Sequence, residues 1–306
     1  MVKTFNKVRH SRFVKVLFAR KAVVFCMIVL SVMVLASVFA PVVAPYGYND
    51  QDYYNVMADP SAEYPLGTDA LGRDILSRLI YGGRVSFSVG LLSVFIAAFI
   101  GILLGLIAGM STGLIGIIIM RIMDAISSVP MIILSLFLSA ILGKGLFNMC
   151  LAIGISMVPT FCRTTRAQTL TVKHADFITA GTLCGASKAT ITFRHVFPNC
   201  VSLNIVSMSM NIGSAIMCES SLSFLGMGIN PPTPTWGAMV NEGYIFLSSK
   251  PLMAIVPGVC IMVVVLCCNI IGDAVRDALD PKLRGTLGTT KRRRRKKVTN
   301  STCEEA

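Results

Sequence analysis

The chain has 306 residues, of which 54% are hydrophobic and only 14% are charged, and its mean hydropathy is +0.71. Soluble domains carry about 25% charged residues, so this composition argues against a soluble enzyme, and disordered chains have the opposite composition. A membrane protein with several spans remains. The Lys and Arg residues that give the net charge of +13 must then lie mostly in the segments outside the membrane.

Apolar stretches predict six membrane-spanning helices, because one span needs roughly 20 mostly apolar residues. The predicted fold class is therefore all-α, in a polytopic membrane protein. In chain order, the expected spans cover residues 22–40, 85–110, 117–142, 146–162, 201–229 and 252–272. The expected domains are a basic arm (1–21), the first transmembrane helix (22–40), an extracytoplasmic segment (41–84), a five-helix core (85–272) and a basic tail (273–306).

The positions of the basic residues predict the orientation of these spans. Most of the 28 Lys and Arg residues fall in the arm, at Arg121, in the segment 163–199 and in the tail. The positive-inside rule then places both termini in the cytoplasm. It also places the segments 41–84 and 230–251 outside, in a multi-pass protein of the cell (plasma or inner) membrane.

The sequence lacks the motifs of an enzyme that hydrolyses ATP or uses a metal. The nearest approach to a P-loop begins at Gly67, but Arg73 and Asp74 stand where Lys and Ser or Thr are required. The three histidines form no HExxH pattern. We therefore expect no catalytic residues, no metal and no cofactor bound by this chain.

A few polar side chains lie in or beside the expected spans. Arg121 and Asp124 are three residues apart and are expected to neutralise each other on one helix face. Glu219 lies about 27 Å along the fifth span, near its outer boundary, if each residue adds about 1.5 Å. A structural role and a pathway role for Glu219 both stay open. Trp236, the only tryptophan, is expected to anchor the chain at the membrane interface.

Glycines four residues apart in the second span predict a close contact with another helix. Such residues line one helix face and let two backbones approach. The glycines are Gly101, Gly105 and Gly109.

The cytoplasmic segment 174–199 is the most informative part of the sequence. A first helix is expected through about Cys184, with Gly185 as its stop. Ser187 can cap a second short helix, and Pro198 fits near the start of the fifth span. Such a rigid knob can dock into a groove of a soluble partner and pass motion into the spans. A helix lying on lipid headgroups is the alternative, and both remain open.

This segment resembles the cytoplasmic "EAA" loop of ABC importer permeases. The stretches 65–90, 120–130, 219–243 and 272–285 are similar to the dipeptide, oligopeptide and nickel permease family, and specifically to its second, C-type subunit. One departure is Thr179, where the family usually has glutamate. The resemblance assigns ATPase coupling to Asp176, Ala180, Gly181, Gly185, Ala186, Ser187, Ile191, His195 and Pro198.

The resemblance implies a type I ABC importer permease fold that works by alternating access. It implies four kinds of partner: a homologous B-type permease subunit, two ABC ATPase subunits that use ATP and magnesium, an extracytoplasmic solute-binding protein and the lipid membrane. No nucleic acid is expected as a partner. The segments 41–84 and 230–250 are candidates for contacting the binding protein.

The resemblance favours dipeptides or oligopeptides as the substrate, with nickel or another small solute as the alternative. A secondary transporter would need ionisable groups near the membrane midplane and usually an inverted repeat, and neither is clear in the sequence. A membrane scaffold without a transport role is a further alternative.

Overall fold

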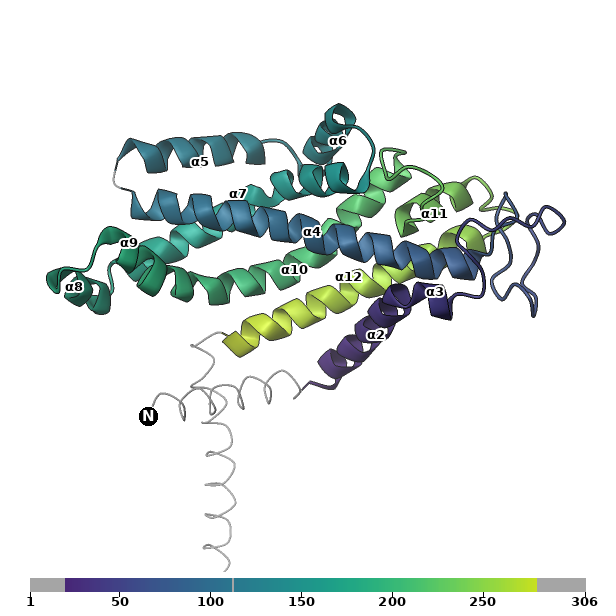
Figure 1. The fold of residues 1–306 in the computed structure, drawn as a ribbon, viewed down its shortest axis with the longest axis horizontal. Coiled ribbons are helices and arrows are strands. Elements are labelled where there is room, and N and C mark those ends of the chain that lie inside the picture. The colour runs from purple at the N-terminus through teal and green to yellow at the C-terminus, as the bar shows by residue number, and fades with distance from the viewer. Residues whose placement is uncertain (1–19, 112, 280–306) are drawn as a thin grey trace, which may run out of the picture.

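The computed structural model describes residues 20–111 and 113–279. Throughout this part of the chain the named elements are helices, which confirms the expected all-α fold (Figure 1). They are α2 (Lys21–Val38), α3 (Ala40–Val43), α4 (Ile75–Met110), α5 (Leu114–Ser127), α6 (Met131–Leu142), α7 (Leu146–Lys173), α8 (Asp176–Leu183), α9 (Lys188–Thr190), the π-helix η1 (Ile191–Val196), α10 (Phe197–Phe224), α11 (Trp236–Tyr244) and α12 (Leu252–Leu279). The outer parts of the basic arm and tail lie outside the described residues.

The lengths and composition of these helices agree with six spans. Five are long and apolar enough to cross a membrane: α2, α4, α7, α12 and the continuous helix Lys188–Phe224 formed by α9, η1 and α10. The pair α5 and α6 passes the same test when it is counted as one span.

The third expected span is not one straight helix, which corrects the prediction for residues 117–142. The axes of α5 and α6 meet at 91°. The break lies at Pro130, which has no backbone N–H and keeps the preceding residue, Val129, out of the helical conformation. Hydropathy alone runs through this point because the residues on both sides are apolar.

Several helix boundaries also differ from the expected spans: α7, for example, continues to Lys173, beyond 162. Two of the differences have a clear local reason. The helix α4 begins at Ile75, before the expected start at 85, because the Asp74 side chain accepts a hydrogen bond from the Ser77 amide at 2.8 Å. The helix α10 ends at Phe224, before 229, where the chain turns through Gly226 with a φ of +76°.

The helices form an elongated bundle with distinct ends. Figure 1 shows α8 and α9 protruding at one end, here called the α8 end, and α11 with the loops that precede α4 at the other, here called the α11 end. The start of α2 and the end of α12 come together through an ion pair of 2.9 Å between Arg20 and Asp277.

The helices α4 and α7 pack so closely that three glycines are required in α4. A Cβ added at Gly105 would lie 2.6 Å from the carbonyl oxygen of Cys162 and 2.7 Å from the Cβ of Thr165. One added at Gly101 or Gly109 would lie 2.5 Å from a side-chain atom of α7. The glycine face of α4 therefore lies directly against the backbone of α7.

We predict that Gly105→Ala lowers the free energy of unfolding by about 1–3 kcal/mol, because the new methyl group pushes α4 away from α7. The midpoint of thermal unfolding in detergent, followed by circular dichroism, measures this change. Gly258→Ala in α12 is the matched control, because no heavy atom lies within 4 Å of its added Cβ. Equal midpoints for the two variants would contradict the close contact.

Candidate functional site

The knob formed by α8 and α9 has the expected helix stop and cap. Gly185, after the end of α8, has a φ of +81°, and the Ala186 amide donates to the Gly181 carbonyl at 3.1 Å. The Ser187 hydroxyl accepts from the Thr190 amide at 3.2 Å and so caps α9. From there the chain continues through η1 into α10 without a loop.

The inner side of the knob is packed against three long helices. Ile178 of α8 and Ile191 of η1 are each 6% exposed. They share one apolar cluster with Leu106 of α4, Val172 of α7 and Cys200 of α10. Because packed interiors leave little free volume, a displacement of the knob must displace these helix ends too.

The structure divides the residues assigned to coupling into an outer and an inner group. Ile191 faces the spans, so its contribution to the knob is internal packing. His195, Ala186 and Gly181 are half-buried. The exposed members are Asp176, Ala180, Gly185, Ser187 and Pro198, and Thr179 is exposed beside them.

Three large apolar side chains of the knob are exposed, and the sequence interpretation did not single out two of them, Phe177 and Leu183. Phe177 is 49% exposed, Leu183 84% and Phe193 65%. Exposed apolar side chains mark sites of contact with a protein partner or with a membrane. The available signal is the position of these bulky residues one or two residues from the isoleucines or from Gly185, in a segment expected to lie outside the membrane.

The expected pairing of Arg121 with Asp124 is wrong. Asp124 forms an ion pair with Arg163 of α7 at 2.9 Å, and both side chains are about half exposed. Contact of Met123 with Val158 and Cys162 holds α5 on α7 and brings the two charges together. Asp124 therefore pairs with Arg163 of the neighbouring helix and not with Arg121 of its own helix.

Glu219 is fully buried between helices. Its Oε1 accepts a hydrogen bond from Ser223 at 2.8 Å, and its Oε2 accepts from Ser86 of α4 at 3.0 Å and from Ser220 at 3.4 Å. These four residues are called the Glu219 cluster below.

Trp236 is also buried, at 2% exposure, so the expected role as an interfacial anchor is wrong. Its indole Nε1 donates to the Leu79 carbonyl of α4 at 2.9 Å, and its ring meets Phe87 edge-on at 5.3 Å. Gly83 makes room for the indole, because a Cβ there would lie 2.8 Å from the ring. The first residue of α11 is thus fixed on α4.

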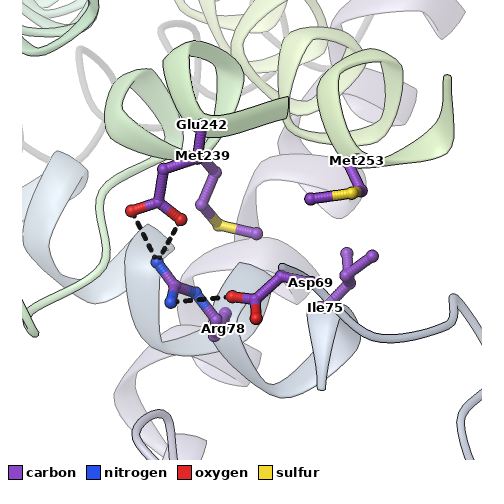
Figure 2. A pocket seen from close by; sticks show the side chains of 6 residues that line it. All are labelled: Asp69, Ile75, Arg78, Met239, Glu242 and Met253. Atoms are coloured by element: carbon purple, nitrogen blue, oxygen red, sulfur yellow. Dashed lines mark hydrogen bonds and ion pairs between the residues drawn. The ribbon is translucent and has the colours of Figure 1, made fainter. Parts of the chain in front are cut away.

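A four-residue ion cluster, Asp69, Arg73, Arg78 and Glu242, joins the segment before α4 and the first turn of α4 to α11, as Figure 2 shows for three of its members. Asp69 accepts from Arg73 at 2.7 Å and from Arg78 at 3.0 Å. Glu242 accepts from the same two arginines at 3.1 and 2.9 Å. Both arginine side chains are buried, whereas that of Glu242 is 40% exposed. Removing one partner of a buried pair costs about 3–5 kcal/mol.

The sequence interpretation did not foresee this cluster. Its trace in the sequence is the repeated spacing of four residues from Asp69 to Arg73 and from Asp74 to Arg78.

The segment before α4 has further internal bonds. Hydrogen bonds from the Asn55 side chain and the Tyr54 amide lower the pKa of Asp52.

Comparison with known proteins agrees with this architecture. Residues 101–285 match the family described as the binding-protein-dependent transport system inner membrane component. Residues 11–60 match the N-terminal transmembrane domain of oligopeptide transport permease C.

Individual relatives match over most of their length. The chain is 42% identical to the glutathione transport system permease protein GsiD of Escherichia coli O6:K15:H31 (strain 536 / UPEC) over 254 residues, which cover 83% of this chain and 84% of the relative. It is 44% identical to the protein of the same name from Shigella flexneri serotype 5b (strain 8401), with the same coverage. The chain therefore belongs to the inner-membrane permease components of binding-protein-dependent ABC importers, and within them to the C-type permeases of the oligopeptide group.

Proposed function

We propose that this chain is one of two permease subunits of an ATP-driven importer for short peptides, with glutathione as the first candidate. The observation that carries the proposal is the 42% identity, over 83% of the chain, to permeases named for glutathione transport. Glutathione is itself a short peptide, so this substrate lies within the class that the sequence resemblance favours. Nickel or another small solute is the second candidate.

The proposed assembly contains a homologous B-type permease subunit, two ABC ATPase subunits and an extracytoplasmic solute-binding protein. The knob at the α8 end meets an ATPase subunit, and the α11 end meets the binding protein. Both termini are then cytoplasmic. This orientation is supported by the ion pair between the start of α2 and the end of α12 and by the excess of basic residues in the arm and tail.

The packing of the knob supports alternating access as the mechanism. ATP-driven closure of the ATPase pair moves the docked knob. Because Ile178 and Ile191 share one cluster with residues of α4, α7 and α10, this movement shifts the helix ends together. The spans then change between two arrangements that open to opposite sides of the membrane.

The substrate is tested by reconstituting the chain with its sister permease, ATPase subunits and binding protein in liposomes. We predict ATP-dependent uptake of radiolabelled glutathione, reduced by excess unlabelled glutathione and unaffected by nickel ions. Vesicles with an ATPase subunit that binds but does not hydrolyse ATP are the control. Uptake of nickel without uptake of any short peptide would overturn the peptide assignment.

The docking role of the knob is tested by Leu183→Glu. We predict that it lowers both uptake and the stimulation of ATPase activity by loaded binding protein by roughly tenfold or more, because it places a charge in the apolar contact. Leu183 is 84% exposed, so the folded chain tolerates the change and still inserts into the membrane.

Thr171→Glu is the matched control for this experiment, since it adds the same charge at an exposed position of α7 near the knob. It is expected to keep normal stimulation of the ATPase. A Leu183→Glu transporter that matches the Thr171→Glu transporter would show that this part of the knob does not contact the ATPase.

A further inference from the structure

A buried carboxylate without an ionic partner lies close to the α11 end of α10. Glu219 is fully buried, and none of the ion pairs in the described part of the chain includes it. Three serine hydroxyls from two helices donate to its two oxygens. Burying a carboxylate is costly in free energy unless it is well hydrogen-bonded. A leucine at this position would not carry that desolvation cost.

The Glu219 cluster lies where α4, α10 and α11 meet. The hydroxyl of Ser86, which donates to Glu219, also accepts from the backbone amide of Trp236 at 3.4 Å. Beside it, a Cβ added at Gly237 would lie 2.5 Å from the Ser220 carbonyl oxygen, so the start of α11 lies directly on the backbone of α10. The buried Thr235 caps α11 by accepting from the Ala238 amide at 3.1 Å.

The opposite end of α11 is held by the ion cluster. Glu242, in the last turn of α11, contacts the guanidinium groups of Arg73 and Arg78. At its start this short helix is thus tied to α4 through neutral hydrogen bonds and lies against the backbone of α10. At its end it is tied through charges to Arg73, before α4, and to Arg78, in the first turn of α4.

We propose that Glu219 is a positioning residue of the transport cycle, which holds the start of α11 against α4 and α10. Through Ser86 and Ser223 its carboxylate fixes the distance between α4 and α10, and through Ser86 it fixes the first residue of α11. The α11 end then moves as one unit when the knob at the other end is displaced. This role rests on membership of the permease family and does not depend on which solute is carried.

The proposal distinguishes two substitutions of similar size. In Glu219→Gln the amide oxygen can accept from Ser86 and Ser220, and the amide nitrogen can donate to the oxygen of Ser223, so the cluster keeps three bonds. In Glu219→Leu the three hydroxyls lose their common acceptor, and a buried hydroxyl without a partner weakens the contact strongly.

The chain contains its own reporter for this contact, because Trp236 is its only tryptophan and is buried beside Ser86. The experiment measures tryptophan emission and acrylamide quenching of the full-length chain in lipid nanodiscs. We expect Glu219→Leu to shift the emission to the red and to raise the quenching constant, because the equilibrium constant for burial of the indole falls about tenfold. Glu219→Gln is expected to match the unmodified chain.

Glu63→Leu is the control, because Glu63 is exposed and lies in the segment before α4. Unchanged emission and quenching in Glu219→Leu would overturn the proposal. If Glu219→Leu fails to elute as a folded, helical species, Ser86→Ala decides in its place. That variant removes the shared hydroxyl without burying a new group, and it is expected to expose Trp236 to quencher.

The functional part is tested in the assembled transporter by the ratio of ATPase activity with and without loaded binding protein. We expect this ratio to fall to about one in Glu219→Leu and to stay at the value of the unmodified chain in Glu219→Gln. An unchanged ratio in Glu219→Leu would refute the positioning role. The ratio stays readable with whichever solute loads the binding protein, so failure of the glutathione assignment is distinguishable from failure of this proposal.

Discussion

The contact between α4 and α7 sets the geometry on which both ends of the molecule depend. Its three glycines allow the two backbones to touch where lipid offers no hydrophobic force to drive helices together, so close packing must supply the attraction. The same helix α4 carries Leu106 beneath the knob and Ser86 beside Glu219. An error in the spacing of α4 and α7 would therefore displace residues at opposite ends of the bundle.

The two ends of the molecule are built from different kinds of interaction. At the α8 end, apolar side chains attach the knob to the long helices and leave other apolar side chains exposed. At the α11 end, buried arginines and carboxylates attach a polar segment to α11. Ionic and hydrogen-bonded contacts are more demanding in direction and distance than apolar ones. The relative positions of the elements at the α11 end are thus fixed more narrowly than those at the α8 end. The knob, by contrast, offers an exposed apolar surface.

Local patterns in the sequence predict the helices and the knob well, because their causes lie within a few residues. Gly185 and Ser187 act on the turns that contain them, and the glycines of α4 are visible as a repeat. The break at Pro130 also has a local cause, but average hydropathy does not register it, because the residues on both sides of the proline are apolar.

Contacts between distant residues could not be predicted in the same way. Asp124 has a neighbour of opposite charge on its own helix, yet it pairs with Arg163, because the packing of α5 on α7 decides which charge is nearer. The burial of Trp236 depends on the space left by Gly83 in another helix. No pattern in one segment contains that information, and the Glu219 cluster, which joins residues more than a hundred positions apart, is the clearest case.

The π-helical turn η1 gives the knob an unusual mechanical relation to the rest of the chain. Since η1 replaces a loop, the chain from Lys188 to Phe224 is one continuous helix of 37 residues, on the order of 55 Å along its axis. A flexible loop at this point would let the knob move without the span, whereas a continuous helix passes a displacement of the knob to the span as tilt or as rotation about the helix axis. The exposed Phe193 of the knob and the buried Glu219 thus lie on the same continuous helix, and a rotation of this helix at one end reorients hydrogen-bonding groups at the other.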